Sequence, residues 1–115
     1  NIASKSGIAV DYPNKQAAYN TSKAAIIMLT KSLAVEWAPY NVRVNCICPG
    51  NFVANPNNPV LQPGHPYREA WLRNTPMGHF GMPEELGGVA VYLASRASSF
   101  TTGAVEVVDG GFTLI

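Results

Sequence analysis

The fold is decided by residues 16–50, which read QAAYNTSKAAIIMLTKSLAVEWAPYNVRVNCICPG. Apolar residues recur at helical spacing from Gln16 to Trp37, and Pro39 stands where a helix would end. Apolar and polar residues then alternate over Asn41–Cys48, which predicts a largely apolar strand that stops at Pro49-Gly50. A long helix that leads directly into such a strand is typical of parallel α/β sheets.

Outside this unit, helices and strands continue to alternate. The further elements expected are a strand tail at Asn1–Ser4, a loop at Ser6–Asn14, a proline-rich segment at Pro49–Pro66, helices at Tyr67–Asn74 and Pro83–Ser95, and a last strand at Ala104–Val108. The alternation predicts an α/β fold with a doubly wound, Rossmann-like parallel sheet. Because only two whole strands and one stub are present, we expect residues 1–115 to be the C-terminal half of a single domain whose N-terminal βαβ half is missing.

The composition narrows the class of protein. The chain has 115 residues, a net charge of +1 and only 13% charged residues, against about 25% in an average domain. Without basic clusters or a long apolar run, neither nucleic acid nor a membrane is an expected partner. The chain shows no signal-peptide pattern and begins without Met, which fits a fragment, and its two cysteines form no disulfide framework. We therefore expect a reducing, cytoplasmic location.

A tyrosine and a lysine carry the most distinctive chemistry. Tyr19 and Lys23 lie four residues apart on the predicted helix, so both side chains face the same way, with Cβ atoms about 5–6 Å apart. A free phenol has a pKa of about 10 and is a poor base, but a nearby ammonium favours the phenolate. Such a phenol can exchange a proton with an alcohol or carbonyl oxygen. Taken alone, the spacing also suits two solvated side chains.

The pair does not stand alone, because the chain resembles the short-chain dehydrogenase/reductase family along its whole length. The matching stretches, in family order and spacing, are Asn1–Gly7, Tyr19–Lys23, Val42–Gly50, Pro83–Glu85, Tyr92–Ser95 and Val108–Gly111. The resemblance implies a dinucleotide-binding fold, NAD(H) or NADP(H) as cofactor, and Ser, Tyr and Lys as catalytic residues. The implied reaction interconverts a secondary alcohol and a ketone.

Carried over residue by residue, the resemblance assigns a role to each member of this set. Tyr19 is the expected acid/base, and Lys23 its electrostatic partner and a ligand of the nicotinamide ribose. Ser4, at the end of the strand tail, is expected to orient the substrate oxygen. Ser6 is the alternative, because it lies 13 residues before Tyr19, the commonest interval in the family. Ser4 is preferred because it lies three residues before Gly7, as the family pattern requires.

The same resemblance places the nicotinamide end of the cofactor at the turn after the second strand. Pro49 and Gly50 are expected to pass along the nicotinamide, and the backbone of Phe52 to meet its carboxamide. Where the family usually has a cofactor-binding Thr, this chain has Ala54, which leaves that contact to Asn55 or removes it. The glycine-rich turn that binds pyrophosphate does not occur in these residues, so the choice between NAD and NADP stays open.

Other chemically active residues have plainer interpretations. Cys46 and Cys48 alternate on a strand without a nearby third ligand, so they are expected to be small buried residues rather than a metal site. Tyr67 and Trp71, four residues apart, either cap a substrate pocket or belong to the core. Asp109 is expected to cap the end of the last strand.

The substrate and the assembly are expectations by analogy. The long interval from Ser4 to Tyr19 and the Asn-rich loop favour a sugar or polyol as the alcohol or ketone substrate. The apolar helices favour a homo-dimer or homo-tetramer. Two alternatives remain: a catalytically inactive fragment or assembly module, and a 3-oxoacyl-type reductase, which would carry the same motifs.

Overall fold

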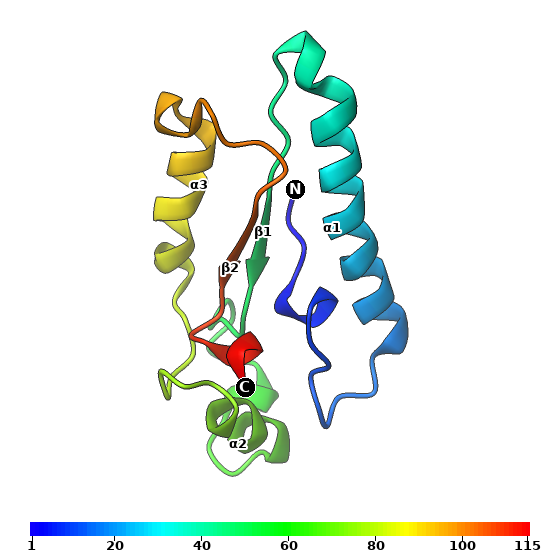
Figure 1. The fold of residues 1–115 in the computed structure, drawn as a ribbon. Helices are drawn as coiled ribbons and strands as arrows, with labels where there is room; N and C mark the ends of the chain where they lie inside the picture. The colour runs from blue at the N-terminus through cyan, green and yellow to red at the C-terminus, as the bar shows by residue number, and fades with distance from the viewer.

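A computed structural model describes residues 1–115. Its helices and strands are α1 (Ala17–Trp37), β1 (Cys46–Pro49), α2 (Pro66–Arg73), α3 (Gly87–Ala94) and β2 (Val105–Val108). In the view of Figure 1 the strands run between α1 and α3, and α2 lies beyond their carboxyl ends. Short 3-10 turns connect or extend these elements, the first of them at Lys5–Gly7.

Three parallel segments form the sheet. β1 pairs with β2 in parallel register, from Cys46 opposite Val105 to Pro49 opposite Val108. On the other side of β1 the N-terminal segment adds a parallel bridge from Ile2 to Ile47. The Ala3 amide donates to the Ile47 carbonyl at 2.8 Å. The predicted strand tail is therefore present, and helical crossovers join the three parallel segments as the α/β prediction requires.

The core is small and lies where α1 covers the sheet. Ala3, Cys46 and Cys48 are buried together, with Ile26 and Ile27 of α1 packed against them. Both cysteines are fully buried, so the prediction that they are small core residues is confirmed. Burial raises the pKa of the Cys48 thiol to about 11, which keeps it protonated at neutral pH.

The strand predicted over Asn41–Cys48 begins later than expected, at Cys46. Its first half does not pair as a regular ladder, because a side chain takes the place of the backbone there. The side-chain nitrogen of Asn45 donates to the Thr101 carbonyl at 3.0 Å. The side-chain oxygen of Asn45 accepts from the backbone amide of Ala104, also at 3.0 Å. Alternation of apolar and polar residues does not reveal such a side-chain bridge.

The helix predicted at Pro83–Ser95 is also shorter than expected. Residues Pro83–Leu86 form a 3-10 turn, and α3 begins only at Gly87. The Glu85 carboxylate accepts from the Met82 amide at 2.7 Å, which closes this first turn. Two glycines follow, and glycine favours an α-helix least among residues other than proline. The helix predicted at Tyr67–Asn74 is α2, shifted by one residue.

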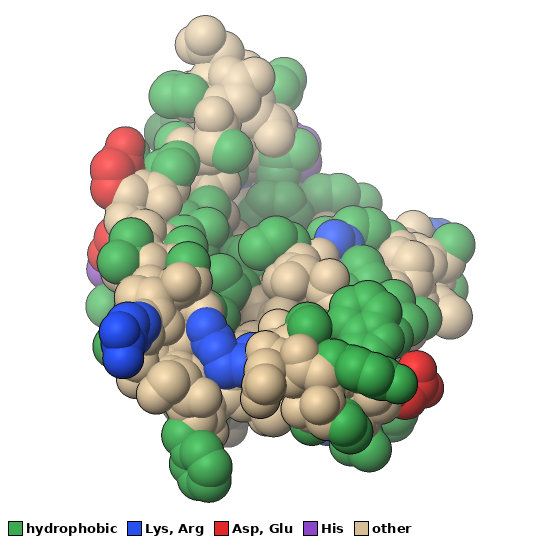
Figure 2. All heavy atoms as spheres, turned by 90° about the horizontal axis from the view of Figure 1, so that it is seen from above, with side chains coloured by type: hydrophobic (Ala, Val, Ile, Leu, Met, Phe, Trp, Pro, Cys, Tyr) green, Lys and Arg blue, Asp and Glu red, His purple; other side chains and the backbone are tan.

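The chain leaves much apolar surface open. Its radius of gyration is 15.3 Å and its extents are 51 × 28 × 25 Å. A compact domain of this length would have a radius of gyration of about 13 Å. Only 14 of 115 residues are buried, and hydrophobic side chains spread over the face shown in Figure 2. The surface is thus that of a partly covered sheet. None of the helices combines the length and the apolar character needed to cross a membrane.

Candidate active site

Gly7 allows the loop that carries Ser4 to pack tightly against α1. A Cβ atom added at Gly7 would lie 2.7 Å from the carbonyl carbon of Lys23 and 2.8 Å from the amide nitrogen of Ala24. Real side chains do not tolerate such distances to backbone atoms, so this contact requires glycine. The loop after the first parallel segment and the helix with the Tyr-Lys pair are thereby brought together.

Tyr19 and Lys23 face the same way, as their spacing predicted. The Lys23 ammonium nitrogen lies 5.6 Å from the centroid of the Tyr19 ring. The same nitrogen donates a hydrogen bond of 3.2 Å to the carbonyl oxygen of Ile2 in the strand tail. Tyr19 keeps 45% of its surface exposed, so its phenol is open to an incoming molecule.

Ser4 and Tyr19 line one pocket at the carboxyl ends of the strands. The pocket has a volume of about 210 Å³. Gly50 and Asn51 enter it from the turn after β1, and Trp71 enters it from α2. The pocket therefore joins four segments far apart in the sequence, at the edge of the sheet where parallel α/β proteins bind ligands. Lys23 lies behind Tyr19 and does not line the pocket.

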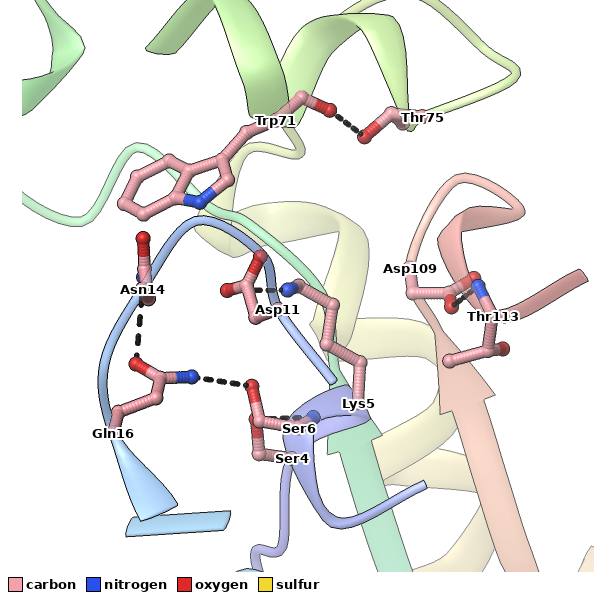
Figure 3. Close-up of polar contacts among 10 residues, drawn as sticks. All are labelled: Ser4, Lys5, Ser6, Asp11, Asn14, Gln16, Trp71, Thr75, Asp109 and Thr113. Carbon is pink, nitrogen blue, oxygen red and sulfur yellow. Dashed lines mark hydrogen bonds and ion pairs between the residues drawn. The ribbon is translucent and has the colours of Figure 1, made fainter. Parts of the chain in front are cut away.

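Both candidate serines line the pocket, but their hydroxyl groups are used differently. The Ser4 hydroxyl oxygen accepts a hydrogen bond from the Ser6 amide at 3.1 Å. The Ser6 hydroxyl oxygen accepts one from the Gln16 side-chain amide at 3.2 Å, and Gln16 is the residue that precedes α1. Figure 3 shows this chain of contacts. Ser6 thus links its loop to the start of the helix, whereas Ser4 begins the 3-10 turn next to the sheet.

Gly50 allows a close approach of two backbone segments within the chain. A Cβ atom there would lie 2.5 Å from the Cα atom of Asp109, just after β2. The Asp109 carboxylate accepts from the amides of Gly111 and Thr113, each at 2.8 Å, which confirms its predicted capping role. Gly50 and Asp109 together hold the carboxyl ends of β1 and β2 close to each other.

The segment after Gly50 leaves one backbone donor free. The Val53 amide donates to the Gly81 carbonyl, and the Gly81 amide donates to the Asn51 carbonyl, each at 2.9 Å. In an extended segment alternate amides point to opposite sides, so the Phe52 amide faces away from Gly81. It makes no hydrogen bond within the chain. A free amide at the predicted carboxamide contact fits a nicotinamide cofactor.

Trp71 belongs to the pocket, and Tyr67 supports it from behind. The Trp71 ring centroid lies 6.2 Å from that of Tyr67 and 6.3 Å from that of Phe80, the latter edge-on. Only Trp71 of these three lines the pocket with Ser4 and Tyr19. The sequence had left the pair undecided between pocket and core, because a helical spacing of four is equally common in both.

Sequence reasoning missed a buried ion pair on the wall of this pocket. The Lys5 ammonium lies 2.7 Å from one Asp11 carboxylate oxygen, and the two residues are only 2% and 4% exposed. The Lys5 ammonium also lies 3.7 Å above the ring of Phe112. Burial lowers the pKa of Lys5, and the nearby Asp11 carboxylate opposes that shift. Two charges in a short loop carry no periodic signal, so only the folded structure reveals the pair.

The chain belongs to the short-chain dehydrogenase/reductase family. A family model described as enoyl-(acyl carrier protein) reductase matches residues 1–113. The chain is 42% identical over 113 residues to galactitol 2-dehydrogenase of Rhizobium johnstonii, covering 98% of this chain and 44% of that protein. It is likewise 42% identical to the NADH-dependent L-xylulose reductase of Ambrosiozyma monospora, covering 97% of this chain and 42% of that protein.

Solved structures give the same assignment. The crystal structure of a short-chain type dehydrogenase/reductase from Mycobacterium marinum matches with a TM-score of 0.87 and 42% identity. The match covers 99% of this chain and 41% of that one. A structure from Agrobacterium tumefaciens with bound NADP matches with a TM-score of 0.88 and 34% identity, over 100% of this chain and 46% of that one. The chain therefore spans less than half the length of each of these relatives.

Proposed function

We propose that residues 1–115 form the catalytic, nicotinamide-facing part of an oxidoreductase that interconverts a secondary alcohol and a ketone. The observation that carries this proposal is the tight contact of Gly7 with the backbone of α1 at Lys23. It brings a serine from one strand end to the same pocket as a tyrosine backed by a lysine. Family membership supports the reaction class.

In this mechanism Tyr19 moves the proton. In the direction of alcohol oxidation, the Tyr19 phenolate takes the hydroxyl proton of the substrate while the carbon–hydrogen bond breaks as hydride. Lys23 is the proposed electrostatic partner of Tyr19, and its ammonium nitrogen lies 5.6 Å from the centroid of the Tyr19 ring. Ser4 donates a hydrogen bond to the substrate oxygen. Its oxygen already accepts from the Ser6 amide, which leaves the hydroxyl proton free to be donated.

The cofactor we propose is NAD(H) or NADP(H), which accepts or supplies the hydride when bound. Tyr19, Lys23, Pro49, Gly50 and Phe52 are the residues proposed to hold its nicotinamide half. The free Phe52 amide supplies a donor for the carboxamide oxygen. Relatives are described with NADH and with NADP, so the comparisons support the cofactor class and not one of the two.

A sugar or polyol is the substrate class we propose. Polar side chains from several segments line the pocket beside Ser4 and Tyr19. The names of the two relatives, a galactitol dehydrogenase and an L-xylulose reductase, support the same class. A long acyl chain would instead require an apolar channel, and the lining of this pocket is mainly polar.

We further propose that these residues are the C-terminal part of one nucleotide-binding domain that assembles as a homo-dimer or homo-tetramer. None of the residues of α3 is buried, and Val91 is 68% exposed. An apolar helix in this state needs covering by further chain or by a second copy. A monomer in light scattering of the full-length protein would contradict the assembly proposal.

The reaction is tested on the full-length protein that contains these residues. The protein is mixed with NAD⁺ or NADP⁺ and with galactitol, D-arabinitol or 2-butanol, each carrying deuterium on the reacting carbon. We expect reduced nicotinamide to form with at least one cofactor and one alcohol, and to carry the deuterium. No reduced nicotinamide with any pair, or deuterium released only into water, would contradict the proposed reaction.

A further inference from the structure

We infer that Asp11, held in place by Lys5, is a specificity-determining residue that accepts a hydrogen bond from a hydroxyl group of a neutral polyhydroxylated substrate. The inference rests on the proposed function, since it assigns a recognition role within the same pocket. It adds that a substrate with a carboxylate at this place is rejected.

Asp11 is held in a fixed position by Lys5. One of its carboxylate oxygens lies 2.7 Å from the Lys5 ammonium, and the Phe112 ring supports that ammonium at 3.7 Å. In Figure 3 the pair lies between Trp71 and the two serines, with Asn14 and Gln16 across from it. A buried carboxylate held in this way has one defined orientation, and the pair has no net charge.

The other Asp11 oxygen has no partner. This Oδ1 atom is buried without any hydrogen bond, although the residue is only 4% exposed. Four further residues that line the pocket have a buried atom without a hydrogen bond: the acceptor Asn14 Oδ1 and the donors Asn51 Nδ2, Trp71 Nε1 and Lys5 Nζ, the last of which has only its ion pair with Asp11. Buried polar atoms are almost always hydrogen-bonded in native proteins, and five such atoms around one pocket are the basis on which we infer a polar ligand there.

The unpaired atoms indicate the chemistry of that ligand. Two acceptors and three donors can be satisfied together by hydroxyl groups, because each hydroxyl both donates and accepts. A carboxylate cannot donate to Asp11 Oδ1 at neutral pH, and it would be repelled by the same oxygen. Lys5 does not offset this repulsion, because its charge is already balanced by Asp11. A neutral sugar or polyol is therefore accepted, and a sugar acid presenting its carboxylate here is not.

The test compares three probes on the full-length protein with NAD⁺ and NADP⁺: galactitol, D-gluconate and 2-butanol. Asp11→Asn removes the charge at nearly constant shape. We expect the ratio of kcat/KM for galactitol to kcat/KM for 2-butanol to fall about tenfold or more, mainly through KM. The ratio for gluconate relative to galactitol should rise about tenfold, because the Lys5 charge is no longer balanced.

A double variant, Lys5→Met with Asp11→Asn, removes both charges and avoids leaving either one buried alone. It should lose the galactitol preference without gaining gluconate turnover. Glu36→Gln, an exposed carboxylate on α1, serves as the matched control and should change neither ratio. Circular dichroism shows whether each variant is folded. If Asp11→Asn does not fold, the galactitol preference of the double variant decides whether Asp11 determines specificity.

The inference is overturned if the wild-type protein prefers gluconate to galactitol. It is also overturned if Asp11→Asn and the double variant both keep the galactitol preference within about threefold. A failure of the proposed function looks different: the wild-type protein would then oxidise none of the three probes, 2-butanol included, and the inference would fall with it.

Discussion

The two ends of the strands use polar residues in opposite ways. At the amino end of β1, Arg43 donates to the Leu93 carbonyl at 2.9 Å and to the Thr101 carbonyl at 3.2 Å. Asn45 in the same place uses both its amide nitrogen and its oxygen. These two side chains stand in for a regular ladder, and each makes at least two hydrogen bonds within the chain.

At the carboxyl end, several polar side chains are held in place but keep one buried atom unpaired. Asp11, Asn14, Asn51 and Trp71 each present a buried atom without a hydrogen-bond partner to one pocket. Unpaired buried atoms, rather than polarity alone, therefore distinguish these four residues from Arg43 and Asn45, which maintain the fold. Each of the following predictions tests that division.

The largest combined effect on stability and turnover is expected at the glycine that joins the two halves of the site. Gly7→Ala places a methyl group against the backbone of α1, so we expect a loss of about 1–3 kcal/mol in the free energy of unfolding. Turnover should fall at least about a hundredfold, since Ser4 moves away from Tyr19. Chemical denaturation and steady-state kinetics measure the two effects.

Gly88→Ala is the matched control for this change. Gly88 lies in α3 with nothing within 4 Å of a built Cβ atom. Alanine there meets no atom of residues 1–115 and should leave turnover unchanged. If Gly7→Ala and Gly88→Ala had the same free energy of unfolding and the same turnover, the role proposed for Gly7 would be refuted.

The next effect separates the two serines of the pocket. Ser4→Ala removes the proposed donor to the substrate oxygen, and kcat should fall about a hundredfold. Ser6→Ala removes only the link to Gln16 and should lower stability more than kcat. The reverse ranking in steady-state kinetics would transfer the catalytic role to Ser6.

The smallest effect compares two asparagines, one at each end of β1. Asn45→Ala breaks two hydrogen bonds and should cost about 1–3 kcal/mol in the free energy of unfolding, with kcat/KM unchanged. Asn51→Ala removes an unpaired donor, so stability should hold while kcat/KM for a polyol falls about tenfold. Calorimetry with kinetics on both variants checks this. If both variants lost stability and kcat/KM to the same extent, the proposed difference between the two ends of β1 would be wrong.

Much of the fold was predictable from local patterns. α1 ends at the predicted residue, because its apolar recurrence is long and Pro39 stops it. The start of β1 was wrong, because the Asn45 bridge depends on residues 56 and 59 positions away in sequence. Contacts of that range leave no periodic trace.

Some residues of the site are likewise predictable from the sequence, and others are not. A family motif, which carries order and spacing, predicts Ser4, Tyr19 and Lys23. Lys5 and Asp11 were missed, since their pairing depends on how a loop folds over the strand ends. A cue did exist: both are charged, in a chain with only 13% charged residues.

The claim that this pocket is an active site is tested most directly by Tyr19→Phe in the full-length protein. We predict a fall in kcat of about a hundredfold to ten-thousandfold, with cofactor affinity kept, because only the proton carrier is lost. Tyr40→Phe, an exposed tyrosine just after α1, is the control and should retain full turnover. A Tyr19→Phe enzyme within about tenfold of wild type, a barrier change of about 1.4 kcal/mol, would contradict the account.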